Sequence, residues 1–198
     1  MATLGVILAG GAARRMDGGD KGLRLLGGRP LLAHVIERMA PQSAGLALNA
    51  NGDPARFSAF GLPVIADALP DRPGPLAGVL AGMEWAATSS ADRVLTVPSD
   101  SPFLPLDLIA RLDAARGGDE GAIALAASSG QMHYVVASWP VSLASELRAW
   151  LAEGERKVQR FQSRYKCVAA FWHPTTHDPF FNVNTPEDLA LAQQILAR

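Results

Sequence analysis

The feature that most limits the possible folds of this chain is the alternation of short apolar segments with longer amphipathic ones. The short segments are rich in β-branched and apolar residues and are bounded by turn residues, which is typical of β-strands. They occupy residues 4–8, 45–49, 64–66, 94–97, 122–127, 134–138 and 168–171. Because strands alternate with helical segments, the sequence predicts a three-layer α/β/α fold with an open, mostly parallel sheet.

The helical segments lie between these strands and after the last one. The strongest start signal is the stretch TPED at residues 185–188, because threonine suits the N-cap, proline the first helical position and acids the first turn. The predicted helices cover residues 30–39, 75–88, 105–115, 141–152, 155–164 and 186–197. No repeat or low-complexity linker interrupts the series, so we expect a single domain over residues 1–198.

Composition limits the partners that such a domain would bind. The chain has 198 residues, of which 48% are hydrophobic, and this suits a globular domain with a substantial core. With 18 basic and 19 acidic side chains the net charge is −1, so neither nucleic acid nor a membrane surface is an expected partner. The single cysteine excludes an internal disulfide, and residues 1–12 lack a signal-peptide pattern. We therefore expect a cytoplasmic protein.

Candidate binding residues are expected along one edge of the predicted sheet. In open α/β sheets, ligands bind beyond the carboxyl ends of the strands. This rule selects the loop after Leu8, the segment from Asn49, Asp67 with the residues after it, and Asp100. These four places would meet at the same edge, where they could form one site.

A glycine-rich, basic loop, LAGGAARRMDGGDKG at residues 8–22, follows the first predicted strand. Its glycines would let the backbone approach a ligand and direct N–H groups at an anion. Arg14, Arg15 and Lys21 add positive charge. The loop therefore predicts a phosphate site, although it matches neither GxxxxGK[ST] nor GxGxxG. The alternative is a solvated surface loop.

Glycines recur in the segment DALPDRPGPLAGVLAG, residues 67–82. Gly74, Gly78 and Gly82 lie four residues apart and would share one face of the predicted helix. Because glycine within a helix costs up to about 1 kcal/mol relative to alanine, a bare face indicates that something must come very close. A planar nucleotide base is one candidate, and tight packing of the helix on the sheet is the other.

Asp100 stands just beyond a predicted strand, in the stretch VLTVPSDSPFLP at residues 94–105. The flanking prolines Pro98 and Pro102 would stiffen its loop. Mg²⁺ in nucleotide sites takes one or two carboxylates together with phosphate oxygens and waters, so a lone carboxylate facing phosphates suits this ion. A turn or helix-capping role for Asp100 is the alternative reading.

Two asparagines precede the last predicted helix, in FFNVNTP at residues 180–186. In an extended segment, Asn182 and Asn184 point in the same direction and Val183 in the other. Two amides on one face can recognise a polar heterocycle. The alternative is turn chemistry before the helix.

Taken in order, LAGG, RM, DKG, PGPLAG and NVNTP make the chain resemble the molybdenum cofactor guanylyltransferases of bacteria, from Leu8 to Pro186. The LAGG, RM and DKG elements are shared with a wider group of nucleotidyltransferases, whereas PGPLAG and NVNTP with LAGG narrow the resemblance to this family. Relatives that use CTP usually have LAAG instead of LAGG. The resemblance implies a Rossmann-like nucleotidyltransferase fold, and an activity that joins GTP to molybdopterin and releases pyrophosphate.

The resemblance also implies roles for individual residues. Asp100 corresponds to a magnesium ligand, and together with Arg15 and Lys21 it forms the expected catalytic group. Asn182 and Asn184 correspond to residues on the pterin side. The nucleotide is expected to contact Leu8, Ala9, Gly10, Gly11, Lys21, Asn49, Asp67, Gly78 and Asp100.

The chain departs from the family pattern at three positions. Asp17 stands where glycine is usual, and its carboxylate would lie near a polyanion. Ser99 replaces a common cysteine, which should be harmless. Tyr134 follows His133 where proline is usual, so no role is transferred to either residue.

The expected reaction is attack of the terminal phosphate of molybdopterin, or of its molybdenum-loaded form, on the α-phosphorus of GTP. The attacking phosphate is already an anion, so positioning and charge neutralisation by the protein and Mg²⁺ would supply the catalysis. Other cofactor-biosynthesis proteins and apo-molybdoenzymes are expected partners. The alternatives are a nucleotidyltransferase that uses CTP or a sugar phosphate, and a regulatory module that binds a nucleotide without catalysis.

Overall fold

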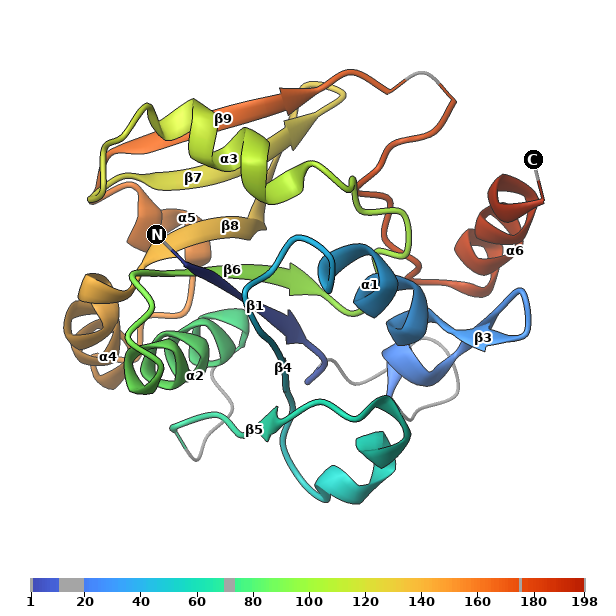
Figure 1. Ribbon diagram of the computed structural model, residues 1–198, viewed down its shortest axis with the longest axis horizontal. Coiled ribbons are helices and arrows are strands. Elements are labelled where there is room, and N and C mark those ends of the chain that lie inside the picture. The colour runs from blue at the N-terminus through green and yellow to red at the C-terminus, as the bar shows by residue number, and fades with distance from the viewer. Residues whose placement is uncertain (1, 11–19, 70–73, 175, 198) are drawn as a thin grey trace.

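A seven-stranded sheet forms the centre of the protein (Figure 1). The computed structural model describes residues 2–10, 20–69, 74–174 and 176–197. The strand order is β5-β4-β1-β6-β8-β7-β9, and every neighbouring pair is parallel except the two that involve β8. The strands are β1 (Thr3–Leu8), β4 (Leu46–Asn49), β5 (Val64–Ile65), β6 (Arg93–Pro98), β7 (Ile123–Ser128), β8 (Gln131–Pro140) and β9 (Cys167–Trp172). The predicted mostly parallel α/β/α fold is confirmed.

Helices cover both faces of the sheet, and each face has its own apolar core. On one face, Leu32 and Val35 of α1 pack in the same buried cluster as Leu108 and Leu112 of α3. The other face carries α2 and α4 (Figure 1). The helices are α1 (Leu31–Met39), α2 (Pro75–Thr88), α3 (Leu108–Arg116), α4 (Ala144–Ala152), α5 (Val158–Gln162) and α6 (Pro186–Leu196). Among the described residues, none of these helices is both long and apolar enough to cross a membrane.

Three short 3₁₀ segments and one hairpin complete the described structure. The 3₁₀ segments are η1 (Lys21–Leu23), η2 (Pro54–Phe60) and η3 (Val141–Leu143). The hairpin pairs β2 (Leu25–Leu26) with β3 (Arg29–Pro30). The hairpin was not predicted, because strands of two residues are too short to show alternation.

Helix boundaries differ from the predictions where the first turn is not α-helical. The helix predicted from residue 105 begins at Leu108, and the one predicted from residue 141 begins with η3 before α4. The segment predicted as a helix over 155–164 is helical only in α5. Element ends are the least constrained part of a sequence prediction, because helix termini fray and tighten.

The start of α6 is the predicted one, and it is capped from both sides. The Thr185 hydroxyl accepts the N–H of Asp188 at 3.2 Å, while the Asp188 carboxylate accepts the N–H groups of Thr185 and Asn184, each at 2.9 Å. This is a capping box, with Pro186 at the first helical position. The box fixes the backbone of Asn184, one of the predicted site residues.

Gly78 and Gly82 lie on the face that α2 packs against the sheet, whereas Gly74, predicted to share that face, is the N-cap residue before the helix. A Cβ at Gly78 would overlap the Asn49 side-chain oxygen and lie 2.7 Å from Leu8 Cδ2, and one at Gly82 would lie 3.0 Å from Val6 Cγ2. These contacts show the alternative that the sequence left open, namely close packing of the helix on β1 and β4. Gly78 therefore packs against Asn49, one of the predicted site residues. Its direct contact with a nucleotide base stays a prediction.

Candidate active site

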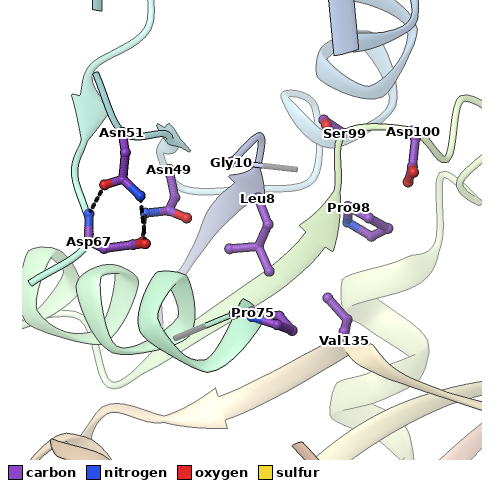
Figure 2. A pocket seen from close by; sticks show the side chains of 11 residues that line it. Leu8, Gly10, Asn49, Asn51, Asp67, Pro75, Pro98, Ser99, Asp100 and Val135 are labelled. Carbon is purple, nitrogen blue, oxygen red and sulfur yellow. Dashed lines mark hydrogen bonds between the residues drawn. The ribbon is translucent and has the colours of Figure 1, made fainter. Parts of the chain in front are cut away.

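A cavity of about 310 Å³ opens at the carboxyl ends of β1, β4 and β6, where the sequence predicted a site (Figure 2). These strands end in register, because Leu8 pairs with Asn49 on one side and with Pro98 on the other. Five of the predicted site residues line the cavity, and they are Leu8, Gly10, Asn49, Asp67 and Asp100. The fold therefore brings together five predicted residues, of which Leu8 and Asp100 lie 92 positions apart in the sequence.

The Asp67 carboxylate is held by two amides on one side of this cavity (Figure 2). Asn49 Nδ2 donates to Asp67 Oδ1 at 2.9 Å, and Asn51 Nδ2 donates to Asp67 Oδ2 at 2.7 Å. In return the Asp67 N–H donates to Asn51 Oδ1 at 2.9 Å. A carboxylate fixed in this way is a rigid acceptor that can bind hydroxyl or N–H groups of a ligand.

Asn51 was missed by the sequence analysis, although a signal for it was present. It lies two residues after Asn49, so in an extended chain it projects to the same side beyond the strand end. Its amide makes both a donor and an acceptor contact with Asp67, which shows that the three side chains act as one unit.

The other side of the cavity is formed by Asp100, which follows β6 (Figure 2). Lys21 Nζ lies 3.0 Å from Asp100 Oδ2, and their side chains are only 20% and 12% exposed. The same ammonium group donates to Asn184 Oδ1. The predicted phosphate lysine and the predicted metal ligand are thus in direct contact, and a multiply charged anion at this place would meet both.

The two asparagines before α6 also lie beside Asp100. The Val183 N–H donates to the Asp100 carbonyl at 2.9 Å, and Val183 itself is fully buried. Asn182 contacts the Ser101 hydroxyl, whereas Asn184 contacts Lys21. The fold therefore brings the predicted pterin residues next to the predicted phosphate residues, and their assignment to the pterin stays a prediction.

The residues predicted to contact the nucleotide through their backbone differ in the structure. The Ala9 N–H is already bonded to the Asn49 carbonyl at 2.8 Å, so it continues the β1–β4 ladder. Gly10 lines the cavity, and no described residue beyond its chain neighbours comes within 4 Å of the place where its Cβ would stand. Gly11, Arg14, Arg15 and Asp17 lie outside the described residues, and their roles stay predictions.

The residues at the cavity fit a nucleotide-borne Mg²⁺ better than an ion held by protein alone. Among the described residues, no group of three or more histidine, cysteine or carboxylate side chains could enclose a metal. Mg²⁺ typically keeps several waters and adds one or two carboxylates and phosphate oxygens. Asp100 supplies such a single carboxylate at the cavity wall.

A partly buried polar cluster that the sequence did not indicate ties the segment before α6 to the sheet. The Ser128 hydroxyl lies 2.7 Å from His133 Nε2 and 2.7 Å from Asp178 Oδ2. Burial lowers the pKa of His133. Burial alone would raise the pKa of Asp178, but hydrogen bonds from the Phe180 N–H and from the Ser128 and Ser129 hydroxyls lower it overall. Ser128 and Asp178 are 50 residues apart, so only the fold reveals this cluster.

Comparison with known proteins points to one family. Residues 5–168 match the family described as the MobA-like NTP transferase domain. A molybdenum cofactor guanylyltransferase of Rhodopseudomonas palustris (strain BisB5) is 56% identical, with 100% of this chain and 95% of the relative covered. One from Bradyrhizobium sp. (strain ORS 278) is 54% identical, with 98% of this chain and 92% of the relative covered.

Solved structures share the fold at low sequence identity. The molybdopterin-guanine dinucleotide biosynthesis protein A of Archaeoglobus fulgidus superposes with a TM-score of 0.74 at 22% identity, over 98% of each chain. A CMP:2-keto-3-deoxy-manno-octonic acid synthetase complexed with CTP has a TM-score of 0.77 at 16% identity, over 100% of this chain and 99% of that one. At these identities the likeness concerns the fold alone.

Proposed function

Because the chain belongs to the molybdenum cofactor guanylyltransferases, a family of MobA-like nucleotidyltransferases, we propose that it transfers GMP from GTP to the terminal phosphate of molybdopterin. The acceptor is molybdopterin or its molybdenum-loaded form, and pyrophosphate is released. The cytoplasm is the proposed location, and apo-molybdoenzymes and other cofactor-biosynthesis proteins are the proposed partners.

One observation carries this proposal, and it is the division of the cavity into two chemically different sides. Asn49, Asn51 and Asp67 form a neutral-to-acidic hydrogen-bonding side, which suits the polar groups of a nucleoside. Across the cavity, Asp100 and its partner Lys21 form the side that suits phosphates. A nucleoside triphosphate has a polar nucleoside at one end and phosphates at the other. The nucleoside would bind beside Asp67 and the phosphates beside Asp100.

The proposed chemistry needs little from the protein beyond positioning and charge. The acceptor phosphate is anionic near neutral pH, so no side chain has to remove a proton before attack. Lys21 would hold phosphate oxygens and stabilise the charge that develops as pyrophosphate leaves. Asp100 would hold Mg²⁺, which supplies further charge neutralisation on the phosphates when it is bound. Asn182 and Asn184 would orient the acceptor beside Lys21.

The proposed preference for guanine rests on polar groups close to the bound nucleoside. A site whose buried donors and acceptors pair with one base leaves them unpaired with another, and so rejects it strongly. Asn51 and Asp67 would supply such groups to the edge of the base.

A turnover assay with a panel of nucleotides and acceptors tests the proposal. We expect pyrophosphate release with GTP, Mg²⁺ and molybdopterin, and release at least about 10²-fold slower with ATP or CTP. Equal turnover with CTP would support the cytidylyl alternative, and a need for a sugar phosphate would support a sugar nucleotidyltransferase. Nucleotide binding without any pyrophosphate release would indicate a regulatory module.

A further inference from the structure

Arg56 is not among the described residues that line the cavity, yet its guanidinium group joins the Asn51 segment, which lines it, to Asp20, the neighbour of Lys21. Arg56 Nε lies 2.6 Å from Asp20 Oδ2, and Nη2 donates to the Asn51 carbonyl at 2.6 Å. Nη1 donates to the Asp53 carbonyl. The guanidinium also stacks 4.5 Å from the ring centroid of buried Phe57. Its position is therefore fixed on several sides.

At one end of this bridge, Asp20 directly precedes the predicted phosphate lysine. Asp20 is the N-cap residue of η1, and its carbonyl accepts the Leu23 N–H at 3.1 Å, which closes the turn around Lys21. The Asp20 side chain makes no capping hydrogen bond within η1 and is bound instead by Arg56. The ion pair thus fixes the point from which the Lys21 side chain extends toward Asp100.

At the other end, Asn51 belongs to the side of the cavity assigned to the nucleoside. Its carbonyl accepts from Arg56, while its amide group holds Asp67 (Figure 2). A continuous series of contacts therefore runs from Asp67 through Asn51 and Arg56 to Asp20, and through the adjoining peptide to Lys21.

The partial burial of the ion pair makes this link stronger than a surface contact. The Arg56 and Asp20 side chains are 28% and 22% exposed, so water screens their attraction less than it would at the open surface. The planar guanidinium binds a carboxylate and a carbonyl at fixed angles, which a lysine ammonium at the same place would not do.

We propose that Arg56 is a positioning residue that acts through Asp20 to hold Lys21 against the phosphates, with the Asn51 segment as its anchor. This inference rests on the proposed function, because it gives Lys21 a phosphate-binding role. Arg56 also neutralises Asp20, whose carboxylate would otherwise repel a triphosphate or draw Lys21 away from it. The anchor remains in place without Arg56, because Asn51 keeps its contacts with Asp67.

Kinetics of four variants test this role, with thermal unfolding as a check on folding. We expect Arg56→Met to lower kcat by up to about 10²-fold, the scale of loss when a reacting group is misplaced by remote changes. Arg56→Lys keeps the positive charge but lacks the planar set of N–H donors, so its kcat should lie between those of Arg56→Met and wild type. Asp20→Asn also breaks the link and should lower kcat, though less than Arg56→Met because it leaves no unpaired carboxylate, and it tests the link if Arg56→Met fails to fold. Arg148→Met, which removes an exposed ion pair with Glu84, should leave kcat unchanged.

A second measurement separates positioning from a general effect on the pocket. Calorimetry should show that guanosine, which lacks phosphates, binds Arg56→Met within about twofold of wild type. Adding Arg56→Met to Lys21→Met should lower kcat no further, since residues that act through one another are not additive.

Four results would overturn the inference. Arg56→Met with a wild-type kcat would show that the link is not used. An equal loss of guanosine and GTP affinity, or additive losses in the double variant, would make Arg56 a merely structural residue. A wild-type protein that releases no pyrophosphate from GTP would overturn the proposed function, and this inference with it.

Discussion

Lys21 and Asp100 are 79 residues apart in the sequence, and their side chains meet at 3.0 Å beside the cavity. Asp100 comes just after β6, and Lys21 begins η1, the first described element after β1. Because β1 and β6 are parallel neighbours, their carboxyl ends necessarily lie side by side. Two opposite charges that were predicted separately are thus combined into one unit.

Asp100→Asn is expected to reduce turnover to background while the fold is kept. A neutral amide binds Mg²⁺ poorly, and the metal's charge stabilisation is worth several kcal/mol in a phosphoryl-type transition state. Pyrophosphate release as a function of Mg²⁺ concentration measures the effect. Asp113→Asn is the matched control, because Asp113 pairs with Arg116 within α3. Near-normal turnover by Asp100→Asn would remove this residue from the metal role.

Lys21→Met is expected to lower kcat by about 10²–10³-fold, the usual loss when one preorganised donor to developing charge is removed. Single-turnover and steady-state kinetics would separate this loss from a change in GTP affinity. A variant in which only KM rises would show that Lys21 binds the ground state and the transition state equally.

Gly78→Ala is expected to weaken GTP binding, because its Cβ would overlap the Asn49 side-chain oxygen and displace that amide from Asp67. Overpacking costs about 1–3 kcal/mol, of which the gain in helix propensity offsets about 1 kcal/mol. Gly82→Ala is the control, because its Cβ would meet Val6 and Val94, which do not line the cavity. Calorimetry with GTP should distinguish the two variants, and equal GTP affinities would contradict the role given to Gly78.

The stability of the protein is expected to fall as the pH drops from about 7 to about 5, with His133 as one cause. Burial lowers the pKa of His133 below its ordinary 6.5, although the nearby Asp178 charge acts in the opposite direction. The folded protein therefore binds fewer protons than the unfolded chain below that pH, and the free energy of unfolding decreases with decreasing pH. Denaturant unfolding at several pH values would measure the slope.

His133→Gln is the variant that tests this origin of the pH dependence. Glutamine can still contact the Ser128 hydroxyl but does not titrate, so the slope between pH 7 and 5 should become shallower. The lowered pKa of Asp178 contributes stability that is lost only at lower pH, below its ordinary 3.8, so it leaves this window unaffected. The same slope in variant and wild type would contradict the assignment.

The parts of the site that could be predicted from the sequence are those that follow directly from strand ends. Asn49 is the last residue of β4, Asp67 and Asp100 come just after β5 and β6, and a single rule about parallel sheets places them together. The start of α6 was also predictable, because a capping box is local in sequence. In both cases the sequence signal, a strand end or a helix start, lies within a few residues of the predicted position.

What could not be predicted depends on contacts between segments far apart in the chain. The direction of β8 is an exception: its apolar pattern does not distinguish parallel from antiparallel pairing, but it follows β7 across a two-residue turn. A signal exists only in the turn before it, where Ser129 and Gly130 have φ of 50° and 75°, as a tight hairpin turn requires. The ion pair between Asp20 and Arg56 has no local signal, since 36 residues separate its members.

Single changes at Asn182 and Asn184 are expected to separate two functions that the sequence analysis treated as one. Asn184 contacts Lys21, so Asn184→Ala should lower kcat as well as use of the acceptor. Asn182 contacts Ser101 instead, so Asn182→Ala should raise the KM for molybdopterin with little change in kcat. Each lost neutral hydrogen bond is worth about 0.5–1.5 kcal/mol, so the double variant should lose roughly ten- to a hundredfold in kcat/KM for the acceptor.

Calorimetric GTP affinity in the presence of Mg²⁺ is the control for both changes, and it should stay close to wild type. The capping box at Thr185 is independent of both side chains, so α6 should remain in place. Loss of GTP affinity with normal acceptor kinetics would reverse the assignment and place the asparagines on the nucleotide. If neither quantity changed, the alternative reading would hold, because the two residues would then serve only to turn the chain into α6.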